Sequence, residues 1–341
     1  MDEKIAHRIL AWYQQNKRLL PWRETSDGYK ILVSEMMLQQ TQVATVLNYY
    51  ENFLKKFPTF ESLALASQED VLNVWQGLGY YSRARNLHKL SKIVVSEYGG
   101  KLPSELETLK SLPGIGDYIA GAVLSIAFSK PYPAVDGNVL RVVSRIDGLK
   151  EDITKQKTRK SVADILQDVI PSGDAGDFTQ SMMELGAIIC IPKSPKCDIC
   201  PICETCVAFI NNETEILPIK TKKAKAKKMN VVVFTVAFDD MILLEHRKKE
   251  GLLNNMWGLP TAESTICGEA KLKKIVSLNI YSKNPLGKVS HIFTHQHWKI
   301  DVVGYRAKDK VILDSHYKWV KVSDLEDYPI PVLFQKCLKY V

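Results

Sequence analysis

The chain has 341 residues, of which 45% are apolar and 25% charged, enough for two or three domains with a buried core. No stretch approaches the roughly 18 apolar residues of a membrane span, and the N-terminal MDEKIAHRIL lacks the apolar core of a signal peptide. We therefore expect a cytosolic protein, or a nuclear one if the source has a nucleus. The net charge of +8 suits a polyanionic partner and equally a solvated basic surface.

Residues 1–210 carry the pattern of a mostly helical region. Apolar side chains recur at helical spacing, for example in Ile5, Ile9 and Tyr13, and short segments rich in Pro and Gly separate the runs. Ser67, followed by acids two and three residues later, predicts the N-cap of one of these helices.

The pattern changes after residue 210. Residues 211–229 contain a lysine-rich stretch with little to bury, which predicts an exposed basic linker. Residues 231–238 and 241–245 are β-like and flank Asp239-Asp240, which predicts a hairpin. Apolar and polar residues also alternate in residues 297–305 and 317–322. Residues 230–341 are therefore expected to form a separate α+β domain.

The stretch LPGIGDYIAG, residues 112–121, places two glycines directly before an apolar helix-like run. Gly114 and Gly116 can adopt positive φ and leave backbone N–H groups exposed before a helix that starts near Asp117. Such a group of N–H donors binds anions, including DNA phosphate. A tight helix-to-helix turn without a ligand has the same sequence pattern.

Four of the seven cysteines, Cys190, Cys197, Cys200 and Cys206, fall within seventeen residues with the spacing C-x6-C-x2-C-x5-C. A disulfide framework is not expected in a chain of this length without a secretion signal. Four thiolates in so short a loop indicate a metal site, and spacing alone allows either zinc or an iron–sulfur cluster. Cys203 lies inside the same loop and is left out of the expected ligand set.

Two carboxylates stand in unusual surroundings. Glu35 is flanked by apolar residues in VSEMMLQQ, where burial would raise its pKa and keep it protonated. Asp136 precedes Gly137-Asn138 at an expected helix start, where the helix N-terminus stabilises an anion. Taken alone, Asp136 is better explained by an N-cap role and Glu35 by an ion pair with Arg or Lys.

Taken together, these motifs resemble the endonuclease III superfamily of helix-hairpin-helix DNA glycosylases over nearly the whole chain. LPGIG followed by an apolar helix is similar to its hairpin, and AVDGNVLRV is similar to the segment that carries its catalytic Asp. WRETSDGYKILVSEMMLQQTQV and GLGYYSRARNLH resemble the adenine-glycosylase branch, MutY.

The resemblance implies roles for the two carboxylates. Glu35 would protonate the adenine, and Asp136, with Asn138 beside it, would stabilise the positive charge at the sugar C1′. Lyase-active relatives carry a lysine where this chain has Tyr118, and a tyrosine cannot form a Schiff base. The resemblance therefore implies base removal with little or no strand cleavage, and it assigns Tyr118 to hold the catalytic Asp and contact the nucleotide.

The resemblance also assigns DNA contacts. Gln40 and Tyr80 match wedge positions that fill the gap left by an extruded base, and Thr41 and Leu78 match positions near the base opposite. The positions that match the adenine pocket are Arg18, Leu20, Trp22 and Arg23. Each aromatic residue alone is equally compatible with a core position.

The family's loop of this cysteine spacing holds a [4Fe–4S] cluster, which we expect to have a structural and DNA-positioning role. The C-terminal domain resembles a Nudix hydrolase in which Trp257-Gly258-Leu259-Pro260 remains but LKKIVSLN stands where the metal-binding acids are expected. Phe293, Thr294 and His295 match the turn that recognises 8-oxoguanine, with Thr in place of Ser.

The resulting hypothesis is a monomeric adenine DNA glycosylase acting on duplex DNA with adenine opposite 8-oxoguanine or guanine. One alternative is an endonuclease III-like pyrimidine glycosylase, which Tyr118 and the extra domain disfavour. The other is a non-catalytic DNA-scanning protein, which the presence of both Glu35 and Asp136 disfavours.

Overall fold

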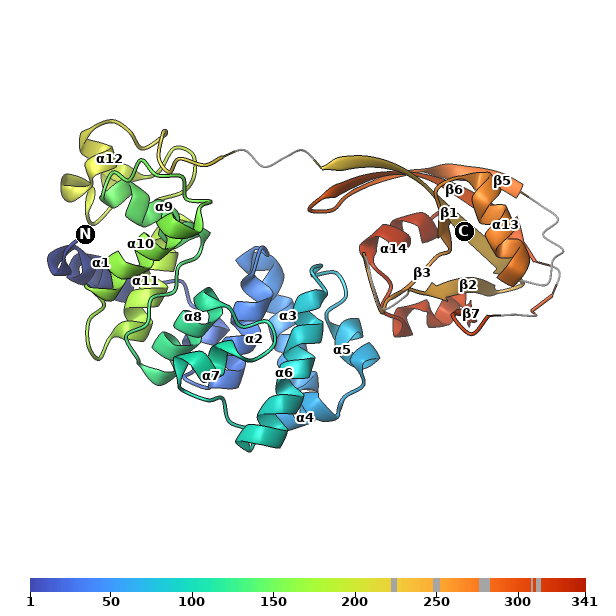
Figure 1. Ribbon diagram of the computed structural model, residues 1–341, viewed down its shortest axis with the longest axis horizontal. Coiled ribbons are helices and arrows are strands. Elements are labelled where there is room, and N and C mark those ends of the chain that lie inside the picture. The colour runs from blue at the N-terminus through green and yellow to red at the C-terminus, as the bar shows by residue number, and fades with distance from the viewer. Residues whose placement is uncertain (222–225, 248–251, 276–282, 308, 311–313) are drawn as a thin grey trace. The chain divides into compact units, whose positions relative to one another are not determined.

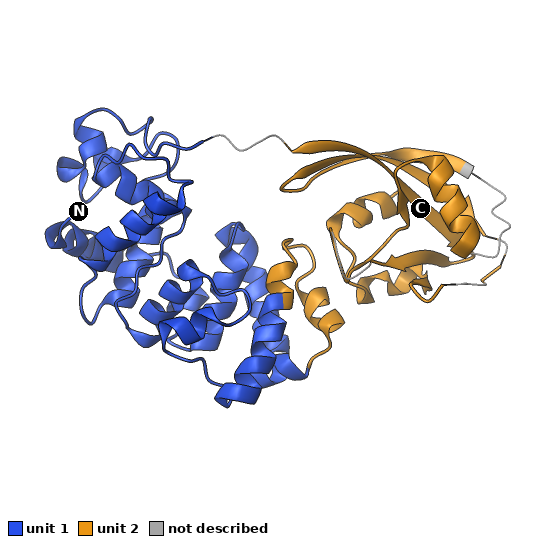
Figure 2. Cartoon of the chain, in the orientation of Figure 1, with its two compact units in different colours: residues 1–65, 86–222 blue, residues 66–85, 223–341 orange. Residues whose placement is uncertain are grey.

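The computed structural model describes residues 1–221, 226–247, 252–275, 283–307, 309–310 and 314–341. The chain divides into two compact units, which are described separately (Figure 2). Unit 1 comprises residues 1–65 and 86–222, and unit 2 comprises residues 66–85 and 223–341. The segment predicted as a linker, residues 211–229, lies partly outside the described residues, because 222–225 are not among them.

Unit 1 is helical, as the spacing of apolar residues predicts (Figure 1). Its helices are α1 (Glu3–Asn16), α2 (Gly28–Leu38), α3 (Val43–Lys56), α4 (Phe60–Leu65), most of α6 (Ser82–Tyr98), α7 (Leu106–Lys110), α8 (Asp117–Phe128), α9 (Gly137–Ile146), α10 (Gln156–Gln167), α11 (Ala175–Ile188) and the short α12 (Val207–Ile210). A 3-10 turn, η1, covers Pro21–Arg23.

Helix α11 is central to the packing of unit 1, because it contacts α1, α8 and α9. One hydrophobic core is built from α1, α9 and α11 together with α10, and Ile9, Val143 and Leu185 are fully or almost fully buried in it. Helix α2 packs on α8. The N-termini of α8 and α9 and the middle of α2 are thus held by a common packed framework, which positions the site described below.

Unit 2 combines α5 (Gln68–Val74) and the turn after it with the α+β part of the chain. The expected N-cap at Ser67 is confirmed, since the Ser67 side chain accepts a hydrogen bond from the Asp70 N–H. The C-terminal elements are β1 (Lys227–Phe238), β2 (Met241–His246), β3 (Trp257–Gly258), β4 (Thr261–Ala262), α13 (Thr265–Ile275), β5 (Lys283–Ile292), β6 (Gln296–Arg306), β7 (Tyr317–Lys321) and α14 (Val332–Leu338).

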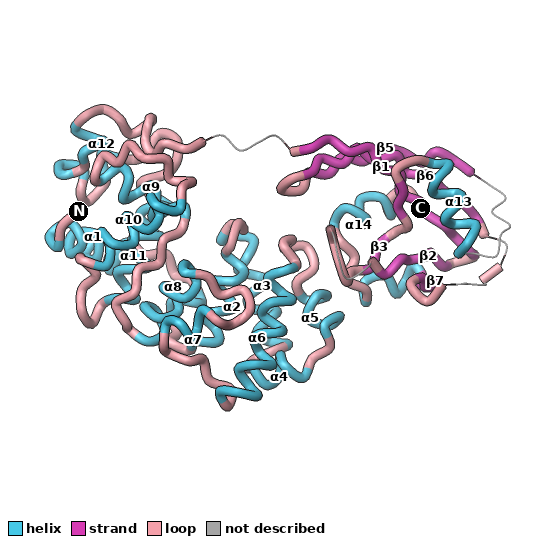
Figure 3. The backbone as a smooth tube through the Cα atoms, in the orientation of Figure 1, coloured by secondary structure: helices cyan, strands magenta, loops and turns pink. Residues whose placement is uncertain are grey.

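The strands of unit 2 form one mixed sheet of order β3-β2-β1-β6-β5, with β4 added to β1 and β7 to β2 (Figure 3). The predicted hairpin is confirmed, because β1 and β2 pair antiparallel through Phe238 and Met241. Strand β1 begins at Lys227, inside the segment predicted as linker, since Lys227–Asn230 pair in parallel with the start of β6.

Strand β1 is buried on both faces of the sheet. Val231 and Val233 of β1 face the core that contains α14, whereas Val232 and Phe234 face the core that contains Leu272 of α13. This alternation follows from the two-residue period of a strand, and a strand covered on both sides reads as a continuous apolar run.

Helix α13 includes the start of LKKIVSLN, the segment that the sequence analysis expected in place of metal-binding acids. The described part of LKKIVSLN, residues 272–275, contributes Lys273 and Lys274 and no carboxylate, and residues 276–279 lie outside the described residues. None of the helices among the described residues has the length and apolar character needed to traverse a membrane.

Candidate active site

A cavity of about 150 Å³ in unit 1 brings together most of the side chains expected to act on the nucleotide. Its wall is built from η1, α2, α8, α9 and α11. The residues expected from the sequence that line it are Arg18, Leu20, Trp22, Arg23, Glu35, Thr41, Tyr118, Asp136 and Asn138. Both carboxylates therefore face one cavity, although 101 residues separate them in the sequence.

Glu35 lies in the middle of α2 with an exposed fraction of 4%. Burial is the largest influence on this carboxyl group and raises its pKa to about 7, assisted by the negative charge of Asp136. The hydrogen bond from Tyr118 and the charge of Arg23 act in the opposite direction. Glu35 can therefore hold a proton at neutral pH, as the apolar sequence around it predicts.

Tyr118, in the first turn of α8, donates its hydroxyl hydrogen bond to Oε2 of Glu35 at 2.5 Å. The resemblance assigned Tyr118 to hold Asp136, so this contact is a correction: the partner of the hydroxyl is the other carboxylate. Desolvation and the charges of Glu35 and Asp136 raise the pKa of Tyr118 well above its ordinary value. The hydroxyl is thus fixed in its neutral, donating form.

Asp136 is the N-cap of α9. Its Oδ1 accepts the Val139 N–H at 2.7 Å and its Oδ2 accepts the side-chain N–H of Asn138 at 3.0 Å. Burial raises the pKa of Asp136, while the donors from Val139 and Asn138 lower it. The N-cap role weighed from the sequence is therefore real, and the same side chain also lines the cavity.

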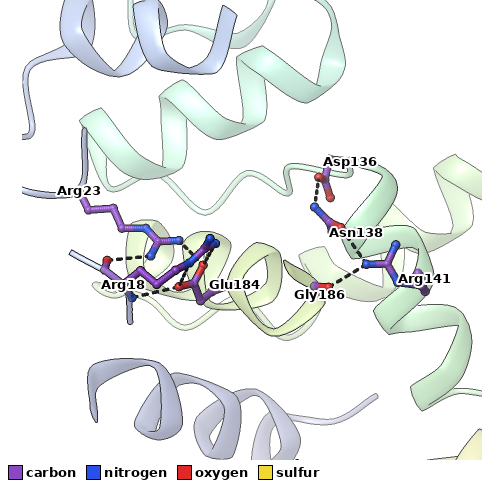
Figure 4. Close-up of polar contacts among 7 residues, drawn as sticks. All are labelled: Arg18, Arg23, Asp136, Asn138, Arg141, Glu184 and Gly186. Carbon is purple, nitrogen blue, oxygen red and sulfur yellow. Dashed lines mark hydrogen bonds and ion pairs between the residues drawn. The ribbon is translucent and has the colours of Figure 1, made fainter. Parts of the chain in front are cut away.

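Asn138 is held in turn by Arg141, one helical turn further along α9. The Nη2 of Arg141 donates to Oδ1 of Asn138 at 2.8 Å and to the Gly186 carbonyl at 2.8 Å (Figure 4). Its Nε donates to the carbonyl of Cys190 at 2.8 Å. A continuous chain of hydrogen bonds thus runs from the cysteine loop to Asp136.

Glu184 of α11 is a cavity residue that the sequence analysis did not single out. It has no exposed surface. Its carboxylate accepts hydrogen bonds from Nε and Nη2 of Arg18, at 2.8 and 2.6 Å, and from Nη2 of Arg23, at 2.8 Å (Figure 4). These hydrogen bonds outweigh burial and lower its pKa to about 2. The signal was available, because Glu184 is a lone acid in the apolar segment SMMELGAI, as Glu35 is in its own.

Three further cavity residues come from the segments before and after α2. Leu20 and Trp22 are almost fully buried, and Trp22 packs edge-on against Tyr50 with ring centroids 5.3 Å apart. Trp22 is thus both a core residue and a wall of the cavity. Thr41, expected near the base opposite, is among the residues that line the cavity.

The glycine turn before α8 differs in part from the expectation. Gly114 has φ of 84°, and a Cβ there would lie 2.8 Å from the Cβ of Asn86, so glycine is required. Gly116 is the N-cap of α8 with φ of −102° and ψ of −178°, which any residue can adopt. Helix α8 starts at Asp117 as predicted, and the residues around Gly116 leave space on its Cβ side.

The two expected wedge residues share a backbone feature. Gln40 has φ of 56° and Tyr80 has φ of 48°, both in the left-handed region that is uncommon for residues other than glycine. Gln40 is exposed and Tyr80 is 43% exposed. Leu78, expected to lie near the base opposite, is buried and belongs to the same turn as Tyr80.

Within unit 2, the expected lesion-recognition turn joins β5 to β6. Phe293 is fixed between His291 and Trp298, with ring centroids 4.5 and 5.2 Å away. Thr294 and His295 are exposed. All three line a cavity of about 730 Å³ to which Tyr80 also contributes.

The cysteine loop surrounds a small cavity of its own in unit 1. Cys190, Cys197, Cys200 and Cys206 line it, and Cys203 does as well. Among the described residues no group of three Cys, His, Asp or Glu side chains could hold a single metal ion. Because a [4Fe–4S] cluster binds each of its four thiolates to a different iron, four cysteines that line one cavity fit such a cluster.

Arg145 organises the same loop from α9. It is 2% exposed, and its guanidinium donates to the carbonyls of Leu217 at 2.9 Å and Ile191 at 2.7 Å and to Sγ of Cys190 at 3.4 Å. Burial and the neighbouring thiols raise the pKa of Cys197, Cys200 and Cys206. Thiolates in this cavity therefore need a bound cation for stability.

Comparison with known proteins agrees with this geometry. Residues 33–168 match the HhH-GPD superfamily of base excision DNA repair proteins, and residues 231–340 match the NUDIX domain. The adenine DNA glycosylase of Buchnera aphidicola (subspecies Schizaphis graminum) is 34% identical over 84% of this chain and 83% of its own length. That of Rattus norvegicus is 35% identical over 84% of this chain and 67% of its own length.

Among solved structures, a thermostable thymine-DNA glycosylase matches with a TM-score of 0.56 and 30% identity, covering 60% of this chain and 95% of that one. An endonuclease III structure at 24% identity and a TM-score of 0.53 shares the fold. The helical unit with its two converging carboxylates, the C-terminal NUDIX domain and the extent of these similarities lead to one conclusion: the chain belongs to the adenine DNA glycosylase family and is a base-excision DNA repair enzyme.

Proposed function

We propose that this enzyme releases adenine from duplex DNA in which adenine is paired with 8-oxoguanine or guanine, and that it leaves the strand intact. The observation that carries the proposal is the convergence of Glu35 and Asp136 on one cavity, with Trp22 and the arginine pair Arg18 and Arg23 in its wall. An aromatic surface and cations beside a proton donor suit a purine leaving group.

Bond cleavage follows from the two carboxylates. Glu35, whose pKa is raised to about 7, donates its proton to the base as the bond between the base nitrogen and C1′ breaks. The bonding electron pair leaves with the base, and positive charge develops on the sugar. Ionised Asp136 stabilises that charge, and water then adds to C1′ and loses a proton.

Tyr118 is the reason that no lyase step is proposed. A phenol hydroxyl cannot form an imine with the opened sugar, and Tyr118 is instead committed to its hydrogen bond with Glu35. The hydroxyl accordingly orients the proton donor.

The adenine must leave the helix to reach the cavity, which costs a few kcal/mol. Gln40 and Tyr80 are proposed to occupy the space that the base leaves, since both are exposed on turns with left-handed backbone. The backbone N–H groups of Gly114 and Gly116, two exposed residues in the turn before α8, are proposed to bind a phosphate. Phe293, Thr294 and His295 are proposed to recognise the oxidised guanine.

The cysteine loop is proposed to hold a [4Fe–4S] cluster through Cys190, Cys197, Cys200 and Cys206. When bound, the cluster supplies a fixed fold for residues 190–206 and no redox step for the hydrolysis. Lys193 and Lys196 then lie on an ordered loop and can contact DNA phosphates. We also propose that the enzyme acts as a monomer.

Release of labelled adenine from an A:8-oxoguanine duplex tests the proposal, run beside A:G, T:G and oxidised-pyrimidine duplexes. Adenine release without strand cleavage is expected from the first two, and intact DNA from the others. Release of thymine or oxidised pyrimidine in preference to adenine would overturn it. The T:G duplex is included because a solved thymine-DNA glycosylase shares this fold.

A further inference from the structure

The turn Gly77–Tyr81 carries an unusual concentration of left-handed backbone. Gly77, Gly79 and Tyr80 have φ of 101°, 72° and 48°, so three of four consecutive residues have positive φ. A residue with a side chain costs roughly 1–3 kcal/mol in such a conformation unless its surroundings fix it. The left-handed conformation of Tyr80 must therefore be stabilised by neighbouring residues.

Arg83, near the start of α6, forms hydrogen bonds with the backbone of the Gly77–Tyr81 turn. Its Nη2 donates to the carbonyls of Gly79 at 3.1 Å and Leu78 at 3.4 Å, and its Nε donates to the carbonyl of Tyr80 at 3.4 Å. Its backbone N–H donates to the Tyr80 carbonyl as well, at 2.9 Å. One guanidinium thus bonds three successive carbonyls that the left-handed backbone turns toward it.

The same guanidinium lies against two aromatic rings. Its Cζ is 5.4 Å from the ring centroid of Trp75 and 5.4 Å from that of Tyr80. Trp75 is fully buried and donates its indole N–H to the Gly79 carbonyl at 3.2 Å, whereas Tyr80 is 43% exposed. Arg83 therefore joins an immobile ring in the core to an exposed ring on the surface.

The chemistry of arginine is required at this position. Arg83 is only 5% exposed, and although burial lowers its pKa to about 10, the group stays charged at neutral pH. A guanidinium offers planar donors that reach several carbonyls at once while its face stacks on aromatic rings. A lysine in the same place would keep the positive charge but lack the planar set of N–H donors that bonds several carbonyls at once.

We propose that Arg83 is a positioning residue for base extrusion: it holds the Leu78–Gly79–Tyr80 turn so that the Tyr80 side chain is presented in advance to the DNA helix. This inference rests on the proposed function, in which Tyr80 fills the space of the extruded adenine. Arg83 acts through Tyr80, so it sets how readily the adenine leaves the helix and has no part in breaking the glycosidic bond.

Loss of Arg83 should therefore slow extrusion of the adenine and leave cleavage of the glycosidic bond unaffected. When the adenine pairs with 8-oxoguanine, extrusion must break that pair and its stacking, and a preformed wedge lowers the cost. When the adenine lies opposite an abasic analogue, no base pair has to be broken, and the rate of extrusion depends less on Tyr80. A loss of fold would slow both substrates equally, whereas loss of the positioned turn slows the paired substrate more.

The experiment compares wild-type enzyme with Arg83→Lys, Arg83→Met and the control Lys89→Met, which removes an exposed cation from the same helix. Extrusion is followed by the fluorescence of 2-aminopurine placed beside the target adenine, and single-turnover release is measured on both duplexes. Both Arg83 variants are expected to lose about tenfold in release from the A:8-oxoguanine duplex and in extrusion, with a smaller loss opposite the abasic analogue. The Lys89 variant should match wild type.

Gly79→Ala supplies a second route that leaves Arg83 and the core in place. A Cβ at Gly79 meets nothing within 4 Å, but the φ of 72° makes alanine unfavourable, so the turn itself changes. It is expected to reproduce the selective extrusion defect with only a small decrease in the midpoint of thermal unfolding, because the strain is confined to the turn. Equal slowing of both duplexes, or normal extrusion in the Arg83 or Gly79 variants of an active enzyme, would overturn the inference, whereas a wild-type enzyme that releases no adenine would overturn the proposed function instead.

Discussion

The hydroxyl of Tyr118 donates a hydrogen bond of 2.5 Å to Oε2 of Glu35, and this short contact orients the proposed proton donor. The donated hydrogen bond stabilises the carboxylate and so lowers the pKa of Glu35, against the larger effect of burial. The balance of these effects leaves the pKa of Glu35 at about 7, so both protonation states are present at neutral pH.

Replacing Tyr118 by Phe should therefore move the pH profile. Removing the donor raises the pKa of Glu35, and because the reaction needs the protonated acid, the alkaline limb of single-turnover adenine release shifts to higher pH. The profile is measured between about pH 5 and pH 9, with Tyr98→Phe as a control tyrosine outside the cavity. A limb that stays in place or moves to lower pH would contradict the assignment of Glu35 as proton donor.

Asp136→Asn separates the two roles of Asp136. Asparagine is as good an N-cap as aspartate, so α9 and the hydrogen bond from the Val139 N–H are retained. The negative charge is lost, and base release is expected to fall by about 10²–10³, the range found when a charge-stabilising group is removed from a catalytic site. Duplex binding and thermal unfolding serve as controls. A variant with normal release would reduce Asp136 to a helix cap.

The sequence was sufficient where the decisive information is local. Apolar neighbours predicted the burial of Glu35, alternation predicted the β1–β2 hairpin, and two glycines predicted the start of α8. It was insufficient where a partner lies far along the chain. Glu184 became part of the site only because Arg18, 166 residues earlier, reaches it, and β1 begins at Lys227 only because β6 is there to pair with it.

Arg141→Gln should weaken both the fold and the reaction. It removes the donors to the carbonyls of Gly186 and Cys190 and the support of Asn138, and unsatisfied buried groups cost about 1–3 kcal/mol each. We expect a lower thermal midpoint and slower adenine release in the same variant. Arg141→Lys keeps the charge and is expected to recover part of the stability. Unchanged release in Arg141→Gln would show that Asn138 does not depend on this chain of hydrogen bonds.

The identity of the bound metal distinguishes the two possibilities left open by the cysteine spacing. Iron, acid-labile sulfide and zinc are measured per chain in protein purified without oxygen. An iron and sulfide content near one [4Fe–4S] cluster is expected, with loss of both in Cys200→Ser and retention in Cys203→Ser. One zinc per chain without sulfide, or loss of iron in Cys203→Ser, would require a different ligand set.

The β5–β6 turn should control which base is accepted opposite adenine. Thr294 and His295 are exposed, so their replacement leaves the core of unit 2 intact. His295→Ala removes a ring that can bond the oxidised base, and the ratio of adenine release from A:8-oxoguanine to release from A:G is expected to fall by roughly tenfold. Thr294→Ser removes one methyl group while keeping the hydroxyl, and the ratio should rise if that methyl crowds the lesion. Equal changes on both duplexes would place the determinant elsewhere, because only a difference between the two rates reports recognition of the lesion.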